Sequence, residues 1–75
     1  MNTEKYFTKR QASGYLTDTL GLPVAEKTLS KLITKGGGPK YRKFGQRVIY
    51  PQDELDIWAQ SRLSGLLNHS SQEVP

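Results

Sequence analysis

The stretch Gly36–Tyr50 reads Gly-Gly-Gly-Pro-Lys-Tyr-Arg-Lys-Phe-Gly-Gln-Arg-Val-Ile-Tyr and joins two structural signals. Three glycines followed by Pro39 end a helix, because neither residue type continues one well. Two short runs rich in aromatic and β-branched residues, 40–44 and 47–50, then flank Gly45-Gln46. Such runs around a glycine-containing pair are typical of a β-hairpin with a two-residue turn. The stretch therefore predicts a helix that stops, followed directly by a hairpin.

The segment before the glycines predicts a helix that begins at Val24 or Ala25. Its apolar residues recur with the spacing of one buried helix face: Ala25, Leu29, Leu32 and Ile33. Lys31 and Lys35 lie toward its C-terminal end, where cations suit the helix dipole.

An earlier helix is predicted over about residues 9–17. Thr8 and Gln11 have the spacing of a capping box, and one apolar side is formed by Phe7, Ala12, Tyr15 and Leu16. Gly14 weakens this helix and suggests close packing against another helix. Residues 17–23 contain Gly21 and Pro23 and predict the connection to the next helix.

A third helix is predicted after the hairpin, with Pro51 at its first position. Three acids, Asp53, Glu54 and Asp56, match the dipole of its first turns. Trp58 shares a helix side with Leu55 and Ala59 and is interpreted as a core residue. We expect a flexible N-terminus over residues 1–6, one domain over 7–64, and a flexible tail over 65–75, in which Leu66 and Leu67 are the part expected to dock.

The composition excludes several classes of function. Seventy-five residues make one small domain at most, and the absence of cysteine rules out disulfides and thiolate chemistry. One histidine does not make a zinc site by itself. No apolar run is long enough to span a membrane, so we expect no membrane partner and a cytoplasmic protein. Asp53 and Asp56 share a helix face but have no nucleophile or histidine beside them, so no catalytic residue, metal site or cofactor is predicted.

The net charge of +4 is unevenly distributed. Residues 26–47 contain seven basic residues and one acid, Glu26, and therefore carry +6, whereas the remaining residues carry four basic and six acidic groups, or −2. The excess lies on the second helix and the hairpin. A helix fills the major groove of DNA and a hairpin beside it reaches the backbone or the minor groove, so the pattern favours duplex DNA as partner.

Two sets of candidate DNA-binding residues follow from this distribution. On the second helix they are Lys27, Thr28, Ser30, Lys31 and Thr34, which can contact bases or phosphates. On the hairpin they are Lys40, Arg42, Lys43, Gln46 and Arg47. The competing interpretations are a solvated helix face and charges that discourage pairing at a sheet edge. The hairpin aromatic residues are expected mainly to pack against the helices; they are Tyr41, Phe44 and Tyr50. Because they are interleaved with Arg and Lys, binding to single-stranded bases also stays open.

A family resemblance rests on an ordered series of residues. The series is Phe7–Ala12, Tyr15-Leu16, Thr28-Leu29, Leu32-Ile33, Gly36–Tyr50 and Asp53–Trp58. In this order it resembles the excisionase/AlpA-type winged helix-turn-helix domains, a branch of the MerR-like superfamily, over about three quarters of the chain. The resemblance implies a mainly α fold with a small hairpin, ordered helix, helix, wing, helix. One departure is Ala25, since the family often has serine at the start of the second helix.

The resemblance also implies a function. It points to sequence-specific binding of double-stranded DNA, without catalysis, by an excisionase of a phage or mobile element that acts with an integrase in the bacterial nucleoid. Self-association on adjacent DNA sites is expected, because one small module contacts too little DNA for high specificity. The alternatives are a small AlpA-like transcriptional regulator with the same binding mode and, more distantly, a protein-interaction adaptor that does not bind DNA.

Overall fold

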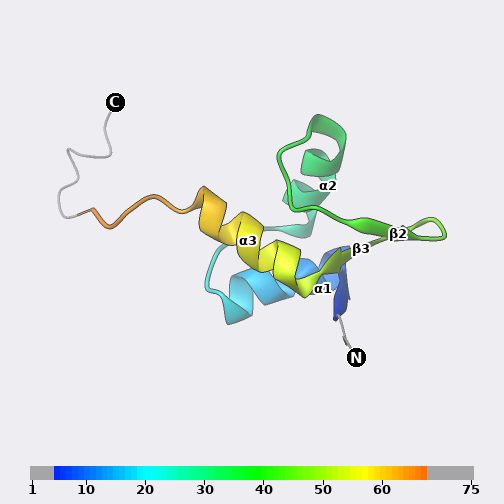
Figure 1. Cartoon of the computed structure of the whole chain (residues 1–75), viewed down its shortest axis with the longest axis horizontal. Coiled ribbons are helices and arrows are strands. Elements are labelled where there is room, and N and C mark those ends of the chain that lie inside the picture. The colour runs from blue at the N-terminus through cyan, green and yellow to red at the C-terminus, as the bar shows by residue number, and fades with distance from the viewer. Residues whose placement is uncertain (1–4, 68–75) are drawn as a thin grey trace.

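The structure is a computed structural model in which residues 5–67 are described. The elements follow the chain in the order β1 (Tyr6–Thr8), α1 (Lys9–Gly14), η1 (Tyr15–Thr19), α2 (Glu26–Lys35), β2 (Arg42–Phe44), β3 (Arg47–Pro51) and α3 (Gln52–Arg62). Helices and sheet form a small α/β domain, from which the β2–β3 hairpin extends to one side (Figure 1). The predicted helices and hairpin are confirmed, but the expectation of a mainly α fold with only a hairpin missed one strand.

That strand, β1, makes the sheet three-stranded. The strand order is β1-β3-β2 and both pairs are antiparallel. Phe7 lies opposite Tyr50, and Phe44 lies opposite Arg47. The Gln52 N–H donates to the Lys5 carbonyl over 2.9 Å and extends the first pairing into α3. The strand includes Tyr6, which was predicted to be part of a flexible N-terminus; residues 1–4 of that segment lie outside the described residues.

The first helix begins as predicted and ends later than predicted. The Gln11 N–H donates to Thr8 Oγ1 over 3.1 Å and the Thr8 N–H donates to Gln11 Oε1 over 3.0 Å, which completes the capping box. The helix does not stop near residue 17, because a π-helical turn, η1, carries it on to Thr19. Gly14 does not mark a close helix contact either, since a Cβ built there meets only Asp18 Oδ2, at 4.0 Å.

The second helix, α2, begins at Glu26, one or two residues later than predicted, and the residue before it provides no side-chain cap. Ala25 has the extended backbone of an N-cap, at φ −78° and ψ 156°, but its side chain accepts no hydrogen bond. Ala25 is exposed, so its predicted place on the buried face is wrong; Leu29 is buried and Leu32 and Ile33 are half-buried. The helix ends at the glycines as predicted, with Gly36 at φ +90°.

The hairpin turn is Gly45-Gln46. Gly45 has φ +66° and Gln46 does not have a positive φ, which is the pattern of a type II′ turn with glycine in the first position. Pro51 corrects another prediction: it is the last residue of β3 and the N-cap of α3, not the first helical residue. Its fixed φ suits both places, and here its φ is −64°.

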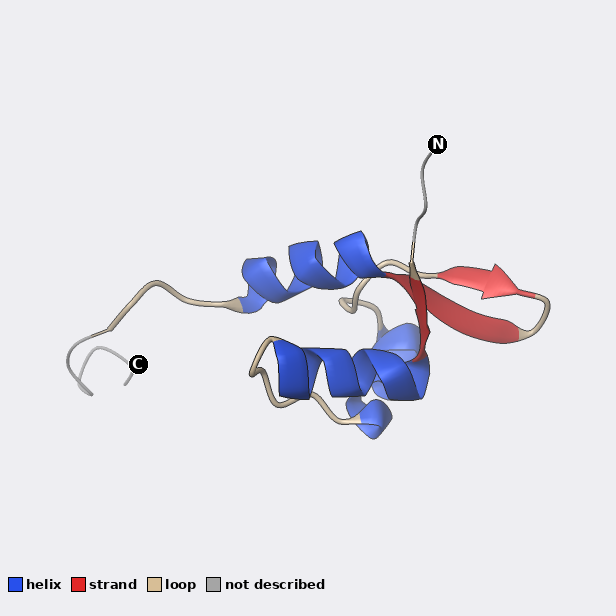
Figure 2. Ribbon diagram, turned by 90° about the horizontal axis from the view of Figure 1, so that it is seen from below, coloured by secondary structure: helices blue, strands red, loops and turns tan. Residues whose placement is uncertain are grey.

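The core lies where the α1–η1 helix, α2 and α3 meet the sheet. It consists of Ala12, Leu16, Leu29, Tyr50, Leu55 and Ala59. The α1–η1 helix and α3 both run away from the sheet in the same direction, one beside the other (Figure 2). Tyr15 joins them, because its hydroxyl donates to Asp56 Oδ1 over 2.6 Å and its ring stacks on Phe7 at 5.0 Å.

Several apolar residues are more exposed than predicted. Trp58 is half-buried against the core; its Nε1 donates to the Gly37 carbonyl over 2.8 Å, and the Arg62 guanidinium lies 5.6 Å from its ring. Phe44 is 76% exposed, which contradicts its predicted packing role. Leu66 is fully exposed and does not dock; residues 68–75 of the predicted tail lie outside the described residues. Among residues 5–67, no helix has the length and apolar character needed to cross a membrane.

Candidate nucleic-acid interface

The outward side of α2 presents three of the five predicted residues together. Lys27, Lys31 and Thr34 follow one another at intervals of four and three positions, which places them on one helix face. All three are exposed, on the side opposite the buried Leu29. This face carries two cations and a hydroxyl, a combination that can donate hydrogen bonds to base edges and phosphates.

Ser30 and Thr28 lie to either side of that face. Ser30 is half-buried, and its Oγ accepts a hydrogen bond from Lys9 Nζ over 3.1 Å. Thr28 lines a separate apolar hollow with Leu22 and Trp58. The structure therefore brings Ser30 to the side of α2 that meets α1 and separates Thr28 from the other predicted residues.

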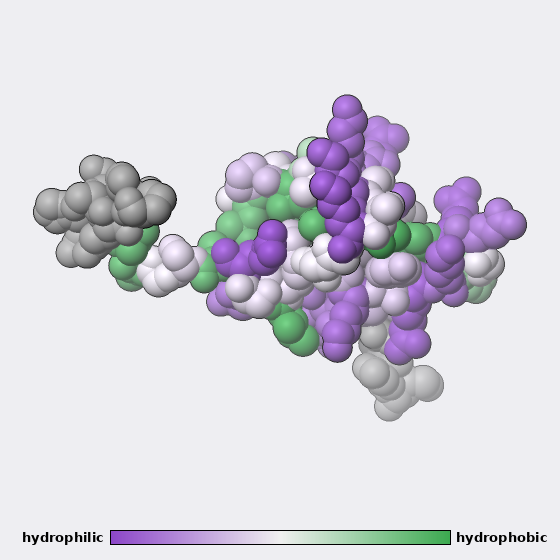
Figure 3. Space-filling view, turned by 90° about the horizontal axis from the view of Figure 1, so that it is seen from above, coloured by the Kyte–Doolittle hydropathy of each residue, from purple (hydrophilic) through white to green (hydrophobic). Residues whose placement is uncertain are grey.

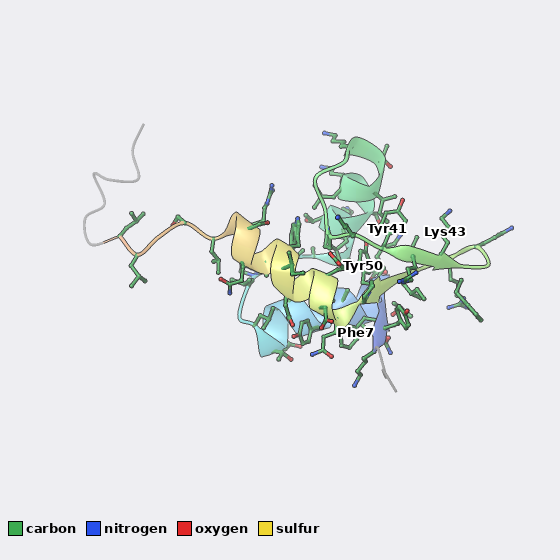
Figure 4. All side chains as sticks on the ribbon, viewed as in Figure 1. Phe7, Tyr41, Lys43 and Tyr50 are labelled. Atoms are coloured by element: carbon green, nitrogen blue, oxygen red, sulfur yellow. The ribbon has the colours of Figure 1, made fainter. Side chains whose placement is uncertain are left out.

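The hairpin presents the second predicted set on both of its faces. Arg47 lies opposite Phe44, and Phe44 is two residues after Arg42 on β2. Because alternate residues of a strand point to the same face, Arg42 and Arg47 share one face of the hairpin. Lys43 pairs with Val48 and takes the other face. Figure 4 places Tyr41 and Tyr50 at the base of the hairpin and Lys43 farther out along β2. Lys40 lies before β2 and is also exposed.

A groove joins the hairpin to the starts of α1 and α2. Its volume is about 290 Å³, and its lining includes Gln46 and Arg47 from the hairpin, Glu26 from α2, and Lys9 and Arg10 from α1. Both predicted elements reach this groove, the hairpin through Gln46 and Arg47 and α2 through Glu26 alone; the α2 candidates Lys27, Lys31 and Thr34 do not line it. We call Lys27, Lys31, Thr34, Ser30, Arg42, Lys43, Gln46, Arg47, Lys9 and Arg10 the basic surface.

Lys9 and Arg10 were not among the predicted site residues. They occupy the first turn of α1, where a cation opposes the helix dipole. Two cations in an unfavourable position are a signal that the charge serves another purpose, and this signal is readable from the sequence once Thr8 is identified as the N-cap.

The seven basic residues between 26 and 47 are all exposed. Within residues 5–67 none of them forms an ion pair with an acid. Seen from above, hydrophilic side chains gather over α2 and over the hairpin (Figure 3). Exposed cations that are not neutralised by neighbouring acids leave a positive potential that attracts a polyanion.

The two perturbed side chains lie outside this surface, in the helix–sheet packing. The hydrogen bond to Asp56 raises the pKa of Tyr15, and desolvation adds to the effect. Burial raises the pKa of Tyr50, as does the proximity of Tyr41, whose ring meets it edge-on at 6.1 Å. Asp56 thus has a structural partner beyond the helix dipole that explained it in the sequence.

Comparison of the sequence with models of known protein families found no match, and comparison with curated proteins found none either.

Proposed function

We propose that the chain binds double-stranded DNA as a winged helix-turn-helix protein. In this proposal α2 enters the major groove, and the β2–β3 hairpin is the wing that contacts the adjacent backbone or minor groove. The observation that carries the proposal is the charge on α2, on the hairpin and on the segment between them: all seven cations between residues 26 and 47 are exposed, and within residues 5–67 none is paired with an acid.

The arrangement of elements gives further support. α2 packs against α1 through its buried face and leaves Lys27 and Lys31 outward, as a recognition helix requires. The hairpin stands between α2 and α3 in the chain, in the position of a wing. The addition of β1 makes that wing part of a three-stranded sheet, and the connection from Leu20 to Ala25 is longer than the turn of a minimal helix-turn-helix.

The experiment that tests DNA binding compares three ligands. The full chain is titrated by fluorescence anisotropy into labelled duplex of random sequence, into single strands of the same sequence, and into an acidic peptide, all at low salt. Binding to duplex in preference to both others is the expected result. Absence of duplex binding at low salt contradicts the proposal, and preferential binding of the peptide favours the protein-interaction adaptor.

Within this proposal we assign the chain the role of an excisionase that guides an integrase toward excision. The ordered series of residues that resembles the excisionase/AlpA-type domains favours a protein that shapes DNA for another enzyme. Several copies bound to adjacent sites would supply the specificity that one module lacks. An excision assay with the matching integrase tests this role: excision that is independent of the protein contradicts it and favours the small transcriptional regulator.

A further inference from the structure

The β2–β3 hairpin carries an exposed phenyl ring directly beside its turn. Phe44 is the last residue of β2 and is 76% exposed, more than any other aromatic residue between residues 5 and 67. The ring of Phe44 has no aromatic or cation partner within those residues, whereas Phe7 stacks on Tyr15 and Tyr41 meets Tyr50 edge-on. Most of this ring is therefore not used to pack the fold.

Phe44 is an unusual residue for this place. β2 is an edge strand of the sheet, and edge strands ordinarily carry charged residues that discourage association with other chains. The neighbours Arg42 and Lys43 follow that pattern and Phe44 does not. An apolar ring near the tip of a projecting arm is suited to contact something outside the chain.

The charges around the ring identify that partner. Arg47 lies directly opposite Phe44 in the register, and Arg42 lies two residues earlier on the same face of β2. A ring that shares its face of the hairpin with two arginines is poorly suited to an apolar protein surface, because both cations would lose water without gaining partners. It is well suited to nucleic acid, where phosphates lie on either side of apolar base faces.

We propose that Phe44 inserts between two base pairs of duplex DNA when the hairpin enters the groove, and that it unstacks and bends the duplex there. The inference rests on the proposed DNA binding. Arg42 and Arg47 hold phosphates beside the insertion point while the ring replaces one base–base stacking contact. Pyrimidine–purine steps are the preferred sites, because they are the easiest to unstack. The turn next to the ring begins with Gly45, which has no side chain to obstruct its approach to the duplex.

The test uses duplexes that the full chain retains from a random-sequence pool at low salt. The fluorescent adenine analogue 2-aminopurine replaces each adenine of the TA and CA steps in turn, and its fluorescence rises when it unstacks. Dyes at the two ends report bending by energy transfer. The variants are Phe44→Ala, Phe44→Leu, which keeps an apolar wedge, and Ile57→Ala as control, since Ile57 is 61% exposed but lies on α3.

The wild-type chain is expected to raise the fluorescence at one step and to bend the duplex. Phe44→Ala should lose both signals and bind about tenfold more weakly with an unchanged salt dependence, whereas Phe44→Leu and Ile57→Ala should keep both. Retained duplexes that show no fluorescence rise overturn the wedge and leave DNA binding intact, and so does an Ala variant that bends DNA like the wild type. A pool that yields no retained duplex overturns the proposed function as well. Tighter binding to single strands than to duplex also overturns the wedge.

Discussion

Tyr15 shows how one side chain joins three elements. Its hydroxyl donates to Asp56 Oδ1 on α3, it accepts from Gln52 Nε2 at 3.4 Å, and its ring stacks on Phe7 of β1. The helical spacing of Tyr15 and Leu16 predicted that both face the core. The partner Asp56 could not be predicted, because it lies 41 residues away and the dipole of α3 explains its charge equally well.

The Tyr15–Asp56 contact makes stability depend on pH in the alkaline range. The pKa of Tyr15 is raised above its ordinary value of 10.0 in the folded chain, chiefly by the hydrogen bond to Asp56. The folded chain therefore holds the proton more tightly than the unfolded chain. The stabilisation is fully present below pH 10 and is lost as the pH rises through the folded pKa.

We expect the free energy of unfolding, measured by urea titration between pH 8 and 11, to fall above about pH 10. Tyr15→Phe should be less stable than the wild type at pH 8 and should have a shallower alkaline fall. An identical alkaline fall in Tyr15→Phe would show that another group titrates.

Replacing glycine by alanine is expected to have opposite effects on stability at Gly14 and Gly38. Gly14 has a helical backbone, and a Cβ there reaches only Asp18 Oδ2 at 4.0 Å, so Gly14→Ala should stabilise the chain by about 0.5–1 kcal/mol. At Gly38 a Cβ would lie 2.8 Å from Leu32 Cβ, so Gly38→Ala should destabilise it. Thermal unfolding of both variants measures this. A destabilising Gly14→Ala would mean that the helix packs more closely there than the structure has it.

At the scale of elements, local signals were sufficient for the helices and the hairpin. Each of these signals acts within a few residues, so neighbouring residue types are enough to predict it. They are the capping box of Thr8 and Gln11, the helix end at Gly36–Gly38 and the turn at Gly45. β1 was missed for the opposite reason: three residues are too few for a periodic pattern, and they become a strand by pairing with residues 49–51. The exposure of Phe44 was missed because an aromatic residue in a strand ordinarily packs.

α2 begins without a side-chain cap, and a substitution at Ala25 can supply one. Ala25 already has the backbone conformation of an N-cap, so the hydroxyl of Ala25→Ser can accept a hydrogen bond from an otherwise unpaired N–H of the first turn. We expect a gain of about 1 kcal/mol in the free energy of unfolding, measured by urea titration. Thr8→Ala is the matched control: it removes the cap of α1 and should lose a similar amount. No gain in Ala25→Ser would place the start of α2 elsewhere.

The two elements of the basic surface should contribute differently to DNA binding. Lys27→Ala or Lys31→Ala should reduce the discrimination between selected and random duplexes, because α2 is proposed to reach base edges. Arg42→Ala or Arg47→Ala should weaken binding to both and flatten the salt dependence by about one unit of slope. Lys5→Ala removes the same charge from the residue before β1 and should have little effect on either quantity. Unchanged binding in all four surface variants would show that the basic surface does not bind DNA.

For the whole molecule, the sequence predicted where the charge lies better than which residues share a face. The excess charge on residues 26–47 was readable by counting, and all seven cations are exposed. The separation of Thr28 from Lys27 and Lys31, and the addition of Lys9 and Arg10, depend on how α2 is rotated against α1 and on which side of the hairpin closes the groove. Tertiary packing decides those relations; the one local signal was the unfavourable position of Lys9 and Arg10 in the first turn of α1.

The central claim is that the basic surface binds duplex DNA through several phosphate contacts at once. The most direct test is the slope of log K against log salt for the full chain and a labelled duplex, measured by anisotropy between about 50 and 200 mM salt. Contacts from about five of the seven cations predict a slope of roughly −4 to −5. A slope near zero, or no binding at the lowest salt, contradicts the claim.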